Sequence, residues 1–198
     1  MQKLAAMHFG AENIEKVMMA FKKVTDGVNY LIYNYADYQG PLQFGPAYPL
    51  VNNSLYQYDF KNNDVTYETD INLNAADGLN KAAMILGRLD NEEAKRLSNI
   101  LNFAVNTLIT CANTKRWYRR LYVTENTDAD FKRNFLYEQM VKIGQEEISN
   151  TFEAAEILAK EPYLQGNNTE MLCTVGAMDA KISLTQKAIE EIKKKINK

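Results

Sequence analysis

The residue types that most often carry catalysis are sparse in this chain. His8 is the only histidine, and a single histidine supplies neither a credible triad nor the Glu-x-x-His pairs of a di-iron bundle. No serine stands in a nucleophile elbow, and no Gly-x-x-x-x-Gly-Lys phosphate loop occurs. Glu153 and Glu156 share one helix face, which is typical of a solvated surface. We therefore expect no catalytic residues, no metal site and no cofactor, and we predict that the chain is not an enzyme.

The densest group of functional side chains is Lys115-Arg116-Trp117-Tyr118-Arg119-Arg120, which contains the only tryptophan. Cations stabilise the C-terminal end of a helix through its dipole, and the rings of such a group can cover a core. Trp, Tyr and Arg also dominate protein–protein hot spots. Stacked rings beside cations suit single-stranded nucleic acid as well. A structural role and a protein interface are favoured, and nucleic-acid contact is expected to be incidental.

The composition indicates which kinds of partner and which cellular compartment to expect. A chain of 198 residues with a net charge of −2 fits one domain and does not indicate a nucleic-acid partner. Cys111 and Cys173 have neither CxxC nor finger spacing, which favours a reducing compartment. The N-terminus lacks the apolar segment of a signal peptide. Asparagines within 97–114 disfavour a membrane span and favour a central helix. We expect an unsecreted protein, in a virion or in the cytoplasm, with no membrane role.

Apolar residues at three- and four-residue steps predict a mainly α-helical single domain over 1–198. The expected class is an antiparallel bundle of four to five helices with an inserted β-hairpin arm. Asp90 with Glu93 is expected to cap the longest helix, and Thr127 or Asp128 the next. The C-terminal helix has a heptad seam, which packs either within the chain or against a neighbouring chain. The predicted helices cover 11–36, 75–87, 91–122, 129–161 and 177–197.

Residues 38–73 interrupt this helical pattern as an irregular insertion. Prolines and glycines keep 39–50 irregular. Residues 54–60 and 65–71 are rich in aromatic and β-branched residues, and they flank a four-residue segment, which predicts a β-hairpin. An isolated hairpin is only marginally stable in water, so its aromatic faces need cover from the helices or from another chain.

An interface is predicted where this hairpin and the aromatic–arginine cluster offer large side chains with polar tips. The predicted interface residues are Tyr56, Tyr58, Phe60, Tyr67, Arg116, Trp117, Tyr118, Arg119 and Arg120.

Residues 108–147 resemble a known family of viral proteins. A long helix ends in the aromatic–arginine cluster, an acidic connector follows, and a second helix carries Phe131, Phe135 and the pair Glu146-Glu147. This segment resembles the paired C-terminal helices of the head–tail adaptor (tail tubular protein A-like) proteins of short-tailed phages. The resemblance covers about a fifth of the chain; the expected ending of the N-terminal helix is missing and helix 177–197 is additional. It implies a ring subunit that contacts portal or tail proteins.

The sequence therefore predicts a structural subunit of a larger assembly, a phage head–tail connector or neck-ring protein that forms a homo-oligomeric ring. Such a protein acts by burying apolar and aromatic surface between subunits. The alternative is a cellular helical-bundle adaptor or regulator that binds one protein partner through the same surface. A pocket between helices for a small molecule is a third possibility.

Overall fold

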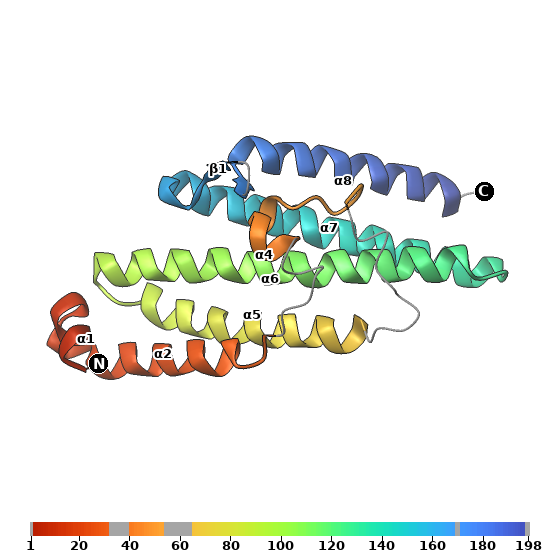
Figure 1. Cartoon of the computed structure of the whole chain (residues 1–198). Helices are drawn as coiled ribbons and strands as arrows, with labels where there is room; N and C mark the ends of the chain where they lie inside the picture. The colour runs from red at the N-terminus through yellow and green to blue at the C-terminus, as the bar shows by residue number, and fades with distance from the viewer. Residues whose placement is uncertain (1, 32–39, 54–64, 169–170, 197–198) are drawn as a thin grey trace.

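The computed structural model describes residues 2–31, 40–53, 65–168 and 171–196. Within them, long helices run back and forth in a single row (Figure 1). Each long helix packs mainly on the helix before it and the helix after it, so the row is open at both ends. The members are α2 (Ile14–Val28), α5 (Val65–Gly87), α6 (Glu92–Glu125), α7 (Asp130–Lys160) and α8 (Val175–Ile196).

Short elements fill the edges of the row. Helix α1 (Gln2–Phe9) and the 3₁₀ turn η1 (Ala11–Asn13) fold back against α2. Helix α4 (Pro41–Phe44) and the 3₁₀ turn η2 (Gly45–Ala47) lie against the middle of α6. Between α7 and α8 come the 3₁₀ turn η4 (Pro162–Leu164) and two short antiparallel strands, β1 (Gly166–Asn168) and β2 (Met171–Cys173).

The predicted fold class was wrong in two respects. The number of helices was too low, because α1 and the short α4 were not expected among the described residues. The inserted β-hairpin was also wrong, because residues 65–71 form the first two turns of α5. The strands β1 and β2 occur instead in a segment where a loop was expected.

The sequence of the first turns of α5 explains this error. Val65, Tyr67 and Thr69 alternate as strand residues do, but the structure buries Val65 and Thr69 and leaves Tyr67 58% exposed. Positions four apart share one face of a helix, and the Thr69 hydroxyl donates to the Val65 carbonyl over 2.6 Å. Burial against α6 therefore overrides a weak strand propensity.

Helix α6 begins and ends close to the predicted limits. Its cap is Asn91, whose side chain accepts from the Ala94 amide over 2.9 Å, rather than the expected Asp90. The next helix, α7, starts after Ala129 without a side-chain cap, so the expectation of Thr127 or Asp128 was wrong.

The central position expected for 97–114 agrees with the structure, because α6 packs on both α5 and α7. Its asparagines Asn106 and Asn113 are buried among protein partners. No helix in the described part of the chain has both the length and the apolar character needed to cross a bilayer.

The heptad seam of α8 packs within the chain. Met178, Ile182, Thr185, Ile189 and Ile192 are buried, and the helix lies along α7. The interpretation that this helix packs in-chain is therefore confirmed. The exposed face of α8 remains available to other molecules.

Candidate functional site

The structure separates the rings of the aromatic–arginine cluster from its arginines. Trp117 and Tyr118 are 3% and 7% exposed and pack with Met140 of α7 and Ile192 of α8. A Cβ placed on Gly144 would lie 2.8 Å from the Ile189 side chain and 3.3 Å from the Trp117 ring, so the glycine leaves room for both. Most of each ring thus covers the core, as the structural interpretation of the cluster proposed.

The three arginines have different surroundings. Arg116 donates to Glu146 over 3.0 Å and to Asn113 over 2.9 Å. The Arg119 guanidinium lies 5.8 Å from the centre of the Tyr122 ring. The Nε atom of Arg120 is buried and has no hydrogen-bond partner within the described residues. Burial lowers the pKa of Arg120, and the like charges of Arg116 and Arg119 lower it further.

Of the remaining predicted interface residues, Tyr67 alone belongs to the described part of the chain. Tyr56, Tyr58 and Phe60 fall outside the described residues. Tyr67 is exposed on α5. The interface prediction for the whole group stays a prediction.

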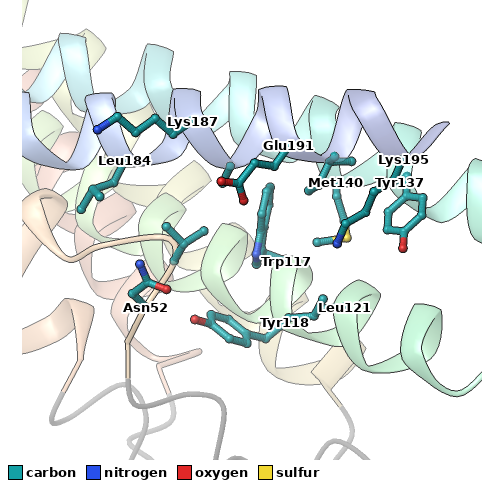
Figure 2. A pocket seen from close by; sticks show the side chains of 13 residues that line it. Asn52, Trp117, Tyr118, Leu121, Tyr137, Met140, Leu184, Lys187, Glu191 and Lys195 are labelled. Atoms are coloured by element: carbon teal, nitrogen blue, oxygen red, sulfur yellow. The ribbon is translucent and has the colours of Figure 1, made fainter. Parts of the chain in front are cut away.

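A groove opens above Trp117, between the segment ending at Asn52 and helices α6, α7 and α8 (Figure 2). Its volume is about 320 Å³, at the lower end of the range for small-molecule pockets. Its walls are mostly apolar, with Leu184 39% exposed at one end. The complete lining comprises Val51, Asn52, Trp117, Tyr118, Leu121, Tyr137, Met140, Leu184, Lys187, Ala188, Glu191, Ile192 and Lys195.

Charged residues of α8 form the rim of this groove. Lys187, Glu191 and Lys195 follow one another at four-residue steps, so they share one face of the helix. The Lys195 ammonium lies 5.7 Å from the centre of the Tyr137 ring. Lys187 and Glu191 form no ion pair within the described residues. The groove therefore combines an apolar floor with alternating charges, of which Lys187 and Glu191 have no ion-pair partner among the described residues.

An exposed aromatic pair lies at the end of the α6–α7 hairpin. Phe131 and Phe135 are 81% and 57% exposed, and they are one turn apart at the start of α7. Asp130 and Glu138 flank them and are exposed as well. We call residues 130–138 the α7 tip. The sequence showed both phenylalanines within the family resemblance but gave no indication of their exposure.

Sequence reasoning missed a buried polar centre between α6, α7 and α8. Glu147 is fully buried and forms an ion pair with Lys181, which is 2% exposed. Lys181 also donates to the Pro46 carbonyl over 2.7 Å. The other carboxylate oxygen of Glu147 accepts from Asn113 over 2.8 Å. The Glu147 carboxylate and the Lys181 ammonium are therefore both bonded to other groups of the protein.

Neighbouring side chains extend this centre along α6. Thr110 donates to Glu147 over 2.6 Å, and Asn150 donates to Thr110 over 3.1 Å. Asn106 and Asn150 exchange hydrogen bonds of 2.8 and 2.9 Å. The signal in the sequence was the asparagine- and threonine-rich run within 97–114, which contains polar residues at core positions and no charge of its own.

A second buried ion pair involves the first residue of the cluster. Lys115 is 1% exposed, and its ammonium lies 2.9 Å from a Glu68 carboxylate oxygen on α5. The pair ties α6 to the first turn of α5, where the hairpin was expected. Lys115 therefore stabilises the packing of two helices.

The histidine and the two cysteines do not form a catalytic or metal-binding group. His8 is exposed, with Nδ1 3.2 Å from a Glu93 oxygen. Cys111 and Cys173 are buried, and neither forms a disulfide within the described residues. Within the described ranges, no group of three or more His, Cys, Asp or Glu side chains has the arrangement of a metal site.

No family model, curated protein or solved structure matches this chain.

Proposed function

We propose that this protein is a structural subunit of a larger assembly and acts by association, without catalysis. The observation that carries the proposal is the exposure of Phe131 and Phe135 at the α7 tip. Complete burial of a phenylalanine side chain stabilises a complex by about 1.5–3 kcal/mol. Two adjacent exposed rings at the end of a helical hairpin therefore form a surface that another protein can bind.

The architecture supports an associative role in a second way. The polar groups at the centre of α6, α7 and α8 are bonded to one another, so they hold the helices in place and do not face a substrate. Exposed surfaces of the described residues that other molecules can contact include the α7 tip and the groove above Trp117.

The specific assembly that we propose is the head–tail connector or neck ring of a short-tailed phage. Its support is the resemblance of residues 108–147 to the adaptor family, a segment that contains the end of α6 and the start of α7. Portal and terminase genes next to the coding sequence would be the expected genomic setting.

Light scattering on the purified chain tests the associative role. We expect a multi-subunit particle at micromolar concentration and a smaller species for Phe131→Ser/Phe135→Ser. The matched control is Phe152→Ser, because Phe152 lies on the same helix and is 52% exposed. A wild-type chain that remains monomeric, alone and with portal or tail proteins, would overturn the proposal.

A cellular adaptor that binds one partner is the second candidate, and the groove favours it. It predicts a monomer or dimer that captures a discrete partner, and it predicts that Leu184→Arg abolishes capture while Phe131→Ser/Phe135→Ser does not.

A further inference from the structure

We propose that the groove above Trp117 receives the α7 tip of a second copy of this chain. The inference rests on the proposed function and names the contact by which copies associate. It joins two surfaces of the molecule, because none of residues 130–138 except Tyr137 lines the groove.

The charges of the two surfaces match in sign and spacing. The groove rim carries Lys187 and Lys195, eight residues apart, and the α7 tip carries Asp130 and Glu138, also eight residues apart. In a helix, both separations correspond to about 12 Å. Two helices laid side by side can therefore bring both acidic side chains to both lysines, whichever way the helices run.

The residues midway between these charges are compatible as well. Glu191 lies midway between the two lysines, and Asn134 lies midway between the two acidic residues. An asparagine amide donates to a carboxylate, whereas a third acidic residue would repel it. Asp130 already contacts Arg133 in the described structure, and Glu138 has no ion pair there.

The apolar parts are complementary as well. The tip offers Phe131 and Phe135, and the groove offers an apolar floor that includes Met140 and the exposed Leu184. Trp117 lines this groove and forms no hydrogen bond within the described residues. This arrangement has the features of a helix bound in a groove.

The tip must come from another molecule. Tyr137 and Met140 line the groove and belong to α7, the same helix that carries Phe131. A residue on a continuous helix cannot fold back onto a wall formed by its own later turns. Each copy therefore offers one tip and one groove, and contacts between unlike surfaces close into rings when the rotation between copies permits.

Mixing two inactive variants is the direct test. Phe131→Ser/Phe135→Ser removes the tip and keeps the groove, whereas Leu184→Arg blocks the groove and keeps the tip. We expect each variant alone to be monomeric and an equimolar mixture to form a 1:1 dimer by light scattering. The control is Leu73→Arg, which changes a leucine of the same 39% exposure on α5 and should leave assembly intact.

The only tryptophan reports which groove is filled. When Trp117→Phe is added to the groove-blocked chain, the tip-less chain holds the sole Trp117 of the mixture. We expect the fluorescence emission of this Trp117 to shift when the two chains are mixed. Unchanged emission in a mixture that still dimerises would place the contact elsewhere and overturn the inference.

Charge reversal provides variants that keep the shape of both surfaces. We expect Lys187→Glu/Lys195→Glu and Asp130→Lys/Glu138→Lys each to weaken association at least about tenfold, and a mixture of the two chains to recover it. Lys142→Glu/Lys194→Glu is the control, because both lysines are exposed and neither lines the groove. Failure of the mixture to recover association would contradict the charge match.

The outcomes separate the inference from the proposed function. Wild-type assemblies that persist in both the tip-less and the groove-blocked variant would show that other surfaces join the copies, and only the inference would fail. A wild-type chain that never self-associates and binds no portal or tail protein would overturn both.

Discussion

Lys181 of α8 and Glu147 of α7 form an ion pair in which the two side chains are 2% and 0% exposed. Removing two charges from water costs several kcal/mol per ion, and the cost is recovered only if the remaining donors and acceptors are satisfied. Thr110, Asn113 and the Pro46 carbonyl supply those bonds here. The pair therefore fixes how α8 lies on α7 and α6.

Breaking this pair should destabilise the fold strongly. We expect Lys181→Met to lower the free energy of unfolding by about 3–5 kcal/mol, because it leaves an unpaired buried carboxylate. The double variant Lys181→Met/Glu147→Leu should recover much of the loss, since it removes both charges. Urea denaturation followed by circular dichroism measures all three chains.

The exposed pair Lys193–Glu190, whose atoms lie 2.8 Å apart, is the control for that experiment. Because solvent screens it, Lys193→Met should change the free energy of unfolding by about 0–1 kcal/mol. A similar loss for both lysine variants would show that burial is not the cause.

Tyr118 should make stability depend on alkaline pH. Burial raises the pKa of its hydroxyl, and the amide of Asn53, which donates to the oxygen, offsets part of this increase. Above the ordinary tyrosine pKa, near 10, the unfolded chain loses this proton while the folded chain keeps it. The folded state then binds more protons, so stability falls as pH rises.

Comparison with Tyr118→Phe isolates this effect from other titrating groups. The variant should lose about 0.5–1.5 kcal/mol at neutral pH, because the hydrogen bond from Asn53 is missing. Between pH 9 and 11, its urea midpoint should decline less than that of the wild type. Parallel pH profiles for the two chains would contradict the prediction.

Periodicity was sufficient to locate α6, α7 and α8. The predicted helix 91–122 corresponds to Glu92–Glu125, and 177–197 corresponds to Val175–Ile196. Each carries a long apolar stripe that one helix face must bury. The first turns of α5 could not be predicted in this way, because β-branched and aromatic residues at alternate positions satisfy a strand pattern equally well over seven residues.

The site was less predictable because it depends on contacts between distant residues. The sequence identified Trp117 and Tyr118 as unusual, but not that they form the floor of a groove with residues of α7 and α8. Likewise, Lys181 and Glu147 are ordinary surface residue types until the structure brings them together. Exposure of Phe131 follows from the open end of the α6–α7 hairpin, which no local pattern encodes.

The thiol of Cys173 should react slowly in the folded protein. Its side chain is 2% exposed, and burial raises its pKa, while the Ala47 backbone and the charge of Lys181 lower it to a smaller extent. Both burial and a low thiolate fraction protect it. Labelling with a disulfide reagent at pH 8 should be fast in urea and slow without it. Ser183→Cys, at an exposed position of α8, provides a fast-reacting control.

A close contact between glycines should make the α2–α5 packing sensitive to one methyl group. A Cβ on Gly78 would lie 2.7 Å from the Gly27 Cα, and the obstructing atoms belong to the backbone of α2. We expect Gly78→Ala to lower the free energy of unfolding by about 1–3 kcal/mol, because the helices must move apart. This loss exceeds the benefit of about 1 kcal/mol that alanine brings to a helix interior.

Gly176→Ala is the matched control for this prediction. Gly176 lies in the first turn of α8, and a Cβ there would meet no atom within 4 Å. The substitution should therefore leave stability unchanged or raise it by up to about 1 kcal/mol. Thermal unfolding of the two variants decides the matter: Gly78→Ala should melt below the wild type and Gly176→Ala at or above it. Equal melting temperatures would mean that α2 and α5 can separate without loss, and that the row of helices is less tightly packed at this end than the glycine contact implies.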